Sequence, residues 1–165
     1  MPDTQEVLGF DINGVIIENL RLGKLVLPGD RFPRTKPVQG AFQGLAELKQ
    51  RGSRIVVISM CKPGQVWLAR RCLGAFRFYE RTGIPFEDVH YCSGHGSKEP
   101  KCRELGVTRF VDDKFGVLST LPDVPCRYLF QGRQREIEKY PNHADALKTI
   151  RRVESWRDLL VDLLR

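Results

Sequence analysis

The stretch Val7–Val15, which reads VLGFDINGV, decides the fold class. Its first four residues, Val7–Phe10, are apolar or small, and Asp11 follows them directly. A short apolar run without alternating polar residues is typical of a strand that is buried on both faces of a parallel sheet. The stretch therefore predicts a buried strand whose carboxyl end carries an acidic side chain.

Further strands and helices are predicted along the rest of the chain. Four more apolar runs follow, at Ile55–Ile58, Val89–Cys92, Arg109–Val111 and Tyr128–Phe130. Stretches with apolar residues at helical spacing lie between and after them, at about 38–51, 66–79, 98–105 and 153–164. Because strands and helices alternate along the whole length, we expect an α/β fold. The expected architecture is a Rossmann-like, three-layer α/β/α arrangement around a five-stranded, mainly parallel sheet.

Length and charge narrow the class of protein. The 165 residues suffice for one sizeable core, so we expect a single domain over 1–165. Hydrophobic residues make up 41% and charged residues 28% of the chain, which argues against disorder. No apolar run approaches the roughly 20 residues of a membrane helix, so we expect no membrane partner. The net charge of +7 favours anionic partners such as phosphorylated metabolites, nucleotides or nucleic acid.

The five cysteines indicate a reducing compartment. Their number is odd and no pair has Cys-x-x-Cys spacing, so we expect free thiols and neither a disulfide framework nor a zinc site. The polar, acidic start Met1–Glu6 lacks the chemistry of a secretory or mitochondrial leader. We therefore expect a cytoplasmic protein.

Polar residues follow three of the predicted strands. Asp11 ends the first, Ser59 the second, and the pair Asp112-Asp113 the fourth. Ligands of an open parallel sheet bind beyond the carboxyl ends of the strands, where these side chains would meet if the strands are neighbours. Clustered carboxylates repel one another unless a cation neutralises them, and hard oxygen ligands suit Mg²⁺, which also binds phosphate oxygens. The pattern therefore predicts a Mg²⁺ site.

These motifs resemble those of the haloacid dehalogenase-like (HAD) superfamily. Asp11–Val15 resembles its first motif, Asp-x-Asp-Gly-Thr/Val, and Ser59 resembles its second. Lys98 resembles the third motif and Phe110–Asp113 the fourth, and all four occur in the family's order within residues 7–113. The chain is most similar to small, nearly capless members of phosphatase or nucleotidase type. The resemblance implies hydrolysis of a phosphate monoester.

The resemblance also implies a role for each matching residue. Asp11 would be the nucleophile that forms an aspartyl-phosphate. Ser59 would donate a hydrogen bond to a phosphoryl oxygen. Lys98 would neutralise charge that develops on the phosphoryl group, with Lys101 as the second candidate for this role. The Mg²⁺ ligands would be Asp11, the main-chain carbonyl of Asn13, Asp112 and Asp113.

Asn13 departs from the family pattern. Phosphatases of the family usually have a second Asp here, the general acid that protonates the leaving group, and an amide cannot transfer a proton at neutral pH. Three interpretations stay open: a slow or acid-independent phosphatase, a non-catalytic protein that binds phosphate and metal, or an engineered Asp→Asn variant of an active enzyme. Dehalogenases also lack the second Asp, but the Asp112-Asp113 pair favours a metal-dependent protein.

The stretch 18–37 is expected to form a short loop or hairpin insert in place of a cap domain, because so few residues cannot bury a core. The resulting open site suits a nucleotide or a nucleic-acid end better than a small sugar phosphate. Arg34 in the insert, Lys62 beyond the second motif and His95 in a Gly-rich loop are candidate substrate contacts. His95 could also supply the proton that Asn13 cannot. The sequence indicates no oligomeric state.

Overall fold

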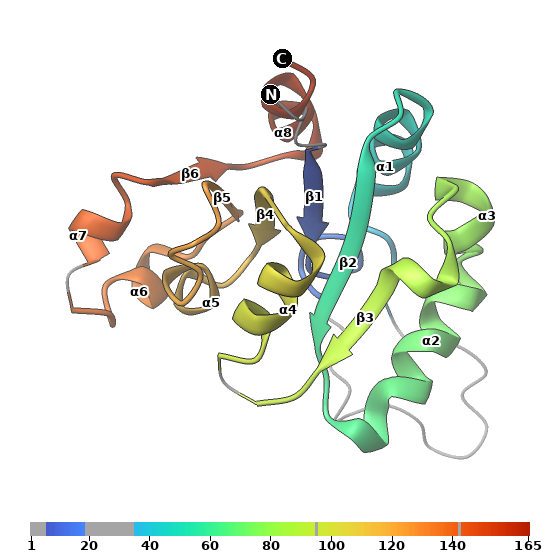
Figure 1. Ribbon diagram of the computed structural model, residues 1–165, viewed down its shortest axis with the longest axis horizontal. Coiled ribbons are helices and arrows are strands. Elements are labelled where there is room, and N and C mark those ends of the chain that lie inside the picture. The colour runs from blue at the N-terminus through green and yellow to red at the C-terminus, as the bar shows by residue number, and fades with distance from the viewer. Residues whose placement is uncertain (1–5, 19–34, 95, 142) are drawn as a thin grey trace.

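A parallel sheet of six strands forms the centre of the molecule (Figure 1). The computed structural model describes residues 6–18, 35–94, 96–141 and 143–165. The strands lie in the order β3-β2-β1-β4-β5-β6, and every neighbouring pair is parallel. Their bounds are β1 Val7–Phe10, β2 Arg54–Met60, β3 Val89–Cys92, β4 Arg109–Asp112, β5 Cys126–Phe130 and β6 Ile150–Val153. This order places β1 between β2 and β4.

Helices cover both faces of the sheet and make three layers. The longer helices are α1 (Ala41–Gln50), α2 (Val66–Ala75), α4 (Lys98–Leu105) and α8 (Trp156–Leu163). The shorter ones are η1 (Pro63–Gln65), α3 (Phe78–Thr82), η2 (Phe86–Asp88), α5 (Phe115–Ser119), α6 (Gln134–Ile137) and α7 (His143–Ala146). Helices α1, α2, α3 and α8 pack on one face, and α4, α5 and α6 pack on the other. The predicted three-layer α/β architecture is confirmed.

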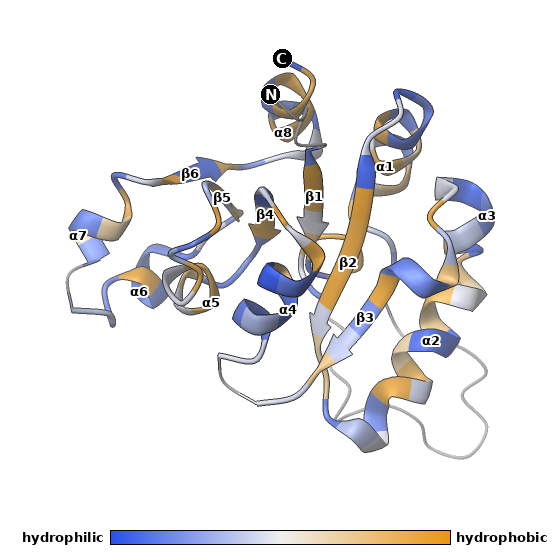
Figure 2. Ribbon diagram, viewed as in Figure 1, coloured by the Kyte–Doolittle hydropathy of each residue, from blue (hydrophilic) through white to orange (hydrophobic). Residues whose placement is uncertain are grey.

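The structure has two hydrophobic cores, one on each face of the sheet, and successive residues of a strand pack into opposite cores. In β2, Ile55 and Val57 face one core, while Val56 and Ile58 face the other, and all four are fully buried. The central strands β1 and β2 are accordingly the most continuously apolar segments in Figure 2. This burial on both faces explains why these strands lack a polar alternation.

The predicted number of five strands is wrong, because β6 adds a sixth. Its sequence IRRV buries only Ile150 and Val153, while the two arginines between them are exposed. An edge strand pairs on one side only, so it needs no continuous apolar run. Val153 consequently belongs to β6, and the C-terminal helix begins at Trp156 and not at 153.

The helix expected over 66–79 is divided into α2 and α3. The break lies at Arg77, which has a left-handed backbone with φ of 55°. Its main-chain N–H donates to the Gly74 carbonyl at 2.9 Å, which closes the turn after α2. Apolar residues continue at helical spacing on both sides of Arg77, so the sequence pattern predicted one helix where the structure has two.

The two ends of the stretch 18–37 lie side by side. The N–H of Glu18 donates to the Lys36 carbonyl at 2.9 Å, and the N–H of Val38 donates to the Ile16 carbonyl at 2.9 Å. The chain thus leaves the core and returns to it at one point. Residues 19–34, including Arg34, lie outside the described part, so the expected insert stays a prediction.

Two further observations concern the whole molecule. All five cysteines are free thiols. Within the described ranges, no helix combines the length and the apolar character that crossing a bilayer requires.

Candidate active site

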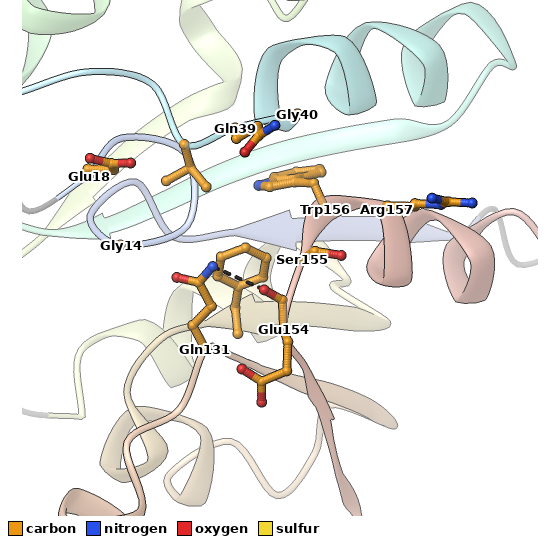
Figure 3. Close-up of a pocket in the computed structure, with 11 residues that line it drawn as sticks. Gly14, Glu18, Gln39, Gly40, Gln131, Glu154, Ser155, Trp156 and Arg157 are labelled. Carbon is orange, nitrogen blue, oxygen red and sulfur yellow. Dashed lines mark hydrogen bonds between the residues drawn. The ribbon is translucent and has the colours of Figure 1, made fainter.

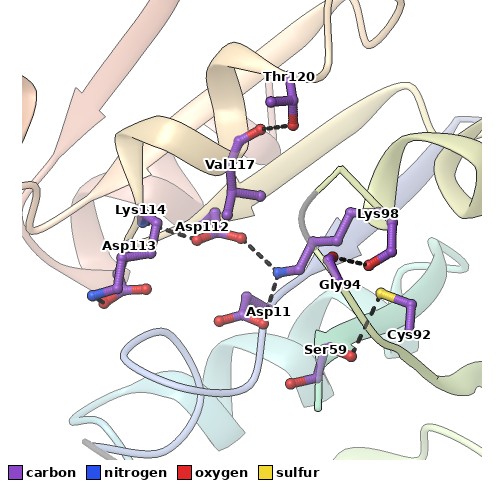
Figure 4. Close-up of polar contacts among 11 residues, drawn as sticks. Asp11, Ser59, Cys92, Gly94, Lys98, Asp112, Asp113, Lys114, Val117 and Thr120 are labelled. Carbon is purple, nitrogen blue, oxygen red and sulfur yellow. Dashed lines mark hydrogen bonds and ion pairs between the residues drawn. The ribbon is translucent and has the colours of Figure 1, made fainter. Parts of the chain in front are cut away.

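Asp11, Ser59 and Asp112 meet at the carboxyl ends of three neighbouring strands (Figure 4). Asp11 follows β1, and its N–H donates to the Val111 carbonyl of β4 at 2.9 Å, which places it beside Asp112. Ser59 is the next-to-last residue of β2 on the other side of β1. The exposed fractions of these three polar residues are only 6%, 6% and 1%. The parallel sheet thus brings the predicted strand-end residues together.

Lys98 joins two of these carboxylates. It is the first residue of α4 and is 3% exposed. Its Nζ lies 2.8 Å from Oδ1 of Asp11 and 2.6 Å from Oδ2 of Asp112. Burial opposes the charged form of Lys98, but the charges and hydrogen bonds of the two carboxylates outweigh burial and raise its pKa. Lys98 is therefore a permanent cation in contact with the predicted nucleophile.

Lys101, the second candidate for the third-motif lysine, contacts a different carboxylate. Its Nζ lies 2.6 Å from Oε2 of Glu104, one turn along the same helix. In the structure, Lys98 therefore occupies the place that the third motif implies.

Asp112 is the most deeply buried acidic residue of the cluster. Its Oδ1 accepts a hydrogen bond from the N–H of Lys114 at 2.8 Å, and its Oδ2 accepts one from Lys98. Burial is the largest influence on its pKa and raises it to about 7, although the Lys98 charge acts in the opposite direction. A cation beside Asp112 would favour its ionised form.

Asp113 lies on the more open side of the cluster. Its Oδ2 lies 2.9 Å from Nζ of Lys114, whose side chain is half exposed. Burial raises the pKa of Asp113, and the Lys114 contact partly offsets this. Gly14 packs against the same carboxylate: its φ is 82°, and a Cβ at Gly14 would lie 2.5 Å from Oδ2 of Asp113. Glycine is required here both for the left-handed turn and for the close approach.

Three carboxylates of this cluster could hold a metal ion. One oxygen each of Asp11, Asp112 and Asp113 lie within 4.8 Å of one another. When all three carboxylates are ionised, they outnumber the two ammonium groups that contact them, and a divalent cation would neutralise the excess negative charge. A donor set made only of oxygen atoms suits Mg²⁺ better than zinc. The residues present therefore fit Mg²⁺.

The C-terminal helix supports the loop that follows Asp11. Nε1 of Trp156 donates to the Val15 carbonyl at 2.8 Å, and the indole stacks on Phe10 with ring centroids 5.4 Å apart. Trp156 is 1% exposed, so the N–H and the carbonyl satisfy each other away from water. The sequence predicted a helix at about 153–164, but this contact joins residues 141 positions apart, and no local pattern indicates it.

Of the remaining predicted site residues, the structure describes Asn13 and Lys62. Asn13 is half-buried and bridges to Ile17 within the loop after β1. Lys62 is exposed at the start of η1, and no ion pair of its ammonium group is found among the described residues. His95 and Arg34 lie outside the described residues, so their roles stay predictions.

Comparisons with known proteins identify the fold. Neither protein-family models nor curated proteins match the chain. Solved structures do match. One of them is D,D-heptose 1,7-bisphosphate phosphatase from B. bronchiseptica, complexed with magnesium and phosphate. It matches at a TM-score of 0.62 and 19% sequence identity, and the match covers 96% of this chain and 98% of that chain. The chain has the haloacid dehalogenase-like fold.

Two further solved structures match over nearly the whole of both chains. A HAD-superfamily hydrolase from Ehrlichia chaffeensis matches at a TM-score of 0.57 and 11% identity, covering 98% of each chain. An uncharacterized protein from Listeria monocytogenes serotype 4b matches at a TM-score of 0.67 and 14% identity, covering 96% of this chain and 97% of that chain. Identities this low show a shared HAD fold. Activity has to be argued from the site.

Proposed function

We propose that this protein is a Mg²⁺-dependent phosphohydrolase that acts on a phosphate monoester of a small molecule. The observation that carries this proposal is the cluster of Asp11, Asp112 and Asp113 around buried Lys98, at the strand ends of a HAD fold. A structural neighbour with the same fold is a phosphatase complexed with magnesium and phosphate. The chemistry below depends on the residues of this chain.

Asp11 serves as the nucleophile. One of its carboxylate oxygens attacks phosphorus, and a new O–P bond forms as the bond from phosphorus to the leaving oxygen breaks. Water then hydrolyses the aspartyl-phosphate, which releases inorganic phosphate and restores Asp11. Lys98 lies 2.8 Å from Asp11 and compensates the negative charge that gathers as the phosphate approaches. The buried Ser59 hydroxyl donates to a phosphoryl oxygen.

Asp11, Asp112, Asp113 and the main-chain carbonyl of Asn13 are the proposed Mg²⁺ ligands. When bound, Mg²⁺ shields the nucleophile from the charge of the incoming phosphate and polarises the phosphoryl group. The protein contributes the arrangement that makes this effective. Gly14 allows the loop to pass close to Asp113, and Trp156 holds that loop through the Val15 carbonyl.

Asn13 makes turnover slow for poor leaving groups. Its amide cannot donate a proton to the departing oxygen, and general acid catalysis typically contributes about 10²–10⁴-fold. The leaving oxygen then takes its proton from solvent or, as the sequence suggests, from His95. We therefore expect activity chiefly on esters whose leaving group is already stable as an anion.

Phosphate release from p-nitrophenyl phosphate and a panel of natural monoesters, with and without Mg²⁺, tests the proposal. Asn13→Asp is expected to raise the rate on natural esters by about 10²–10⁴-fold. Asp11→Asn is expected to abolish turnover, and Asp145→Asn, which alters an exposed acid of α7, is expected to leave it unchanged.

Two results would contradict the proposal. Turnover that persists in Asp11→Asn would mean that Asp11 is not the nucleophile. If neither the chain nor Asn13→Asp hydrolyses any ester while Mg²⁺ and phosphate still bind, the chain is a non-catalytic binding protein.

A further inference from the structure

A cavity of about 630 Å³ is lined by residues that follow β1, β5 and β6 and by the start of α1 and α8 (Figure 3). Four segments form its wall: the loop after β1, the start of α1, the end of β5 and the start of α8. Its volume lies in the range of roughly 300–1,000 Å³ that is typical of small-molecule sites. The residues proposed above to act on phosphate are not part of this wall.

Gly14 connects the cavity to the proposed phosphate site. This glycine lines the cavity, and it also packs so closely on Asp113 that a Cβ would lie 2.5 Å from the carboxylate. The cavity and the acidic cluster therefore adjoin at Gly14.

The described part of the wall is polar but not strongly basic. Among the described residues that line the cavity, the charged ones are Glu18, Glu154 and Arg157, so carboxylates are in the majority. A second phosphate, or the backbone of a nucleic acid, would meet no excess of positive charge from these residues. The cavity therefore suits an uncharged group.

Uncharged hydrogen-bonding groups make up much of the remaining wall. Gln39, Gln131 and Ser155 line the cavity, and the buried residues Phe130 and Trp156 lie beneath its surface. Figure 3 shows Gln39 and Gln131 on opposite sides of this space. Amides both donate and accept hydrogen bonds, as hydroxyl groups do, so such a wall is complementary to a compact group that carries several hydroxyls.

Gln131 is held in an uncommon backbone conformation. Its φ is 49°, a left-handed value that few residues other than glycine adopt. Its N–H donates to the Val153 carbonyl at 2.8 Å, and its Nε2 donates to the Glu154 carbonyl at 3.0 Å. These bonds fix the amide at the edge of the cavity. Residues held in this way are often found where a ligand is clamped.

We propose that this cavity binds the uncharged, hydroxyl-bearing part of the substrate while the phosphate lies at the acidic cluster. This inference rests on the proposed function and narrows its substrate class to phosphate monoesters of sugars or other polyols. It replaces the preference for nucleotides or nucleic-acid ends that the small insert suggested.

A kinetic experiment tests the role of the cavity. The variant Gln131→Gly removes the amide and retains a residue that favours positive φ, and Gln39→Ala removes the opposite amide. Gln50→Ala, an exposed glutamine at the far end of α1, is the matched control. Because glucose 6-phosphate, ribose 5-phosphate and glycerol 3-phosphate have poor leaving groups, they are measured with Asn13→Asp present in every variant. In this background we expect kcat/KM to fall at least tenfold in both cavity variants and to stay unchanged in the control. With p-nitrophenyl phosphate, which has no hydroxyls to place, all three variants should stay within twofold of the unaltered chain.

A binding experiment gives an answer that does not depend on turnover. The chain has two tryptophans, Trp67 and Trp156, so Trp67→Phe leaves the cavity residue Trp156 as the single indole. Trp67 is 58% exposed, so its replacement should be tolerated. In this background, with Asp11→Asn to prevent hydrolysis, at least one of the three polyol phosphates should change the fluorescence saturably. Inorganic phosphate and adenosine 5′-monophosphate should not.

The outcomes separate the two proposals. If p-nitrophenyl phosphate is hydrolysed but no polyol phosphate changes the fluorescence, the cavity inference is overturned and the proposed function stands. If the fluorescence changes but no version of the chain hydrolyses an ester, the cavity inference stands and the proposed function fails. An equal fall of kcat/KM for p-nitrophenyl phosphate and the polyol phosphates in Gln131→Gly would also overturn the inference.

Discussion

The buried ion pairs of Lys98 and the surface ion pair of Arg151 with Asp162 have nearly the same geometry in very different surroundings. Lys98 Nζ lies 2.8 Å and 2.6 Å from its two carboxylates, and the Arg151 guanidinium lies 2.5 Å from Asp162. The Lys98 side chain is 4% exposed, whereas that of Arg151 is 59% exposed. Distance is therefore not what distinguishes these contacts.

The difference in burial explains why only the buried cluster indicates function. Removing three charged groups from water costs several kcal/mol per ion, and their mutual attraction offsets that cost only when the geometry is good. Apolar side chains of similar volume at these positions would stabilise the folded state about equally well. The surface pair stays largely hydrated, so it has no such desolvation cost and contributes little to the free energy of unfolding. The buried cluster is accordingly best explained by the chemistry that it performs.

The sharpest test of this comparison is to remove the cation from each region. Lys98→Met leaves the buried Asp11 and Asp112 without their ammonium partner, and we expect the free energy of unfolding to fall by about 3–5 kcal/mol. Arg151→Met should cost less than about 1 kcal/mol, because solvent screens the exposed pair. Urea denaturation of both variants in Mg²⁺-free buffer measures the difference. Equal costs would show that burial is not what distinguishes the two regions.

Mg²⁺ should stabilise the folded chain through the acidic cluster. At about 100 times its Kd, an ion that binds only the folded state adds about 2.7 kcal/mol to the free energy of unfolding. The thermal midpoint should therefore rise with added MgCl₂ and return to its starting value with EDTA. Asp113→Asn should weaken this response, while Asp145→Asn on the surface of α7 should retain it. An undiminished response in Asp113→Asn would place the ion elsewhere.

Trp156→Phe should have a smaller effect than the two changes above. The Val15 carbonyl would lose its donor inside the protein, which costs about 1–3 kcal/mol, and kcat should fall because the loop after Asp11 is held less firmly. Trp67→Phe, at an exposed tryptophan, is the control for a general effect of removing an indole. The free energy of unfolding and kcat are the two measurements. If kcat is unchanged while stability falls, Trp156 supports the core and not the site.

Much of the fold could be predicted because its decisive signals are local. The apolar runs that became β1, β2 and β4 lie within a few residues of the observed bounds, and α4 spans the same residues, 98–105, as predicted. The errors arose where local signals were weak or misleading. Strand β6 buries only two of its four residues, and the left-handed Arg77 interrupts an apolar spacing that continues on both sides.

The candidate site could be predicted in part for the same reason. Asp11, Ser59 and Asp112 stand at strand ends, and parallel strands bring their carboxyl ends to one edge. Which lysine reaches that edge was open from sequence, since Lys98 and Lys101 lie within one turn of the same helix. The orientation of α4 directs Lys98 toward Asp11, while Lys101 contacts Glu104. The roles of Arg34 and His95 stay predictions.

A parallel α/β sheet with acidic residues at the ends of its strands can be predicted from the sequence, because burial on two faces demands continuous apolar runs and leaves polar residues only where the runs stop. The contact by which Trp156 holds the loop after Asp11, and the cavity that Gly14, Gln39 and Gln131 line, are visible only in the folded chain. These contacts join segments that are far apart in the chain. Their geometry depends on where helices α1 and α8 pack against the sheet, whereas the apolar spacing of a helix indicates only which of its faces is buried.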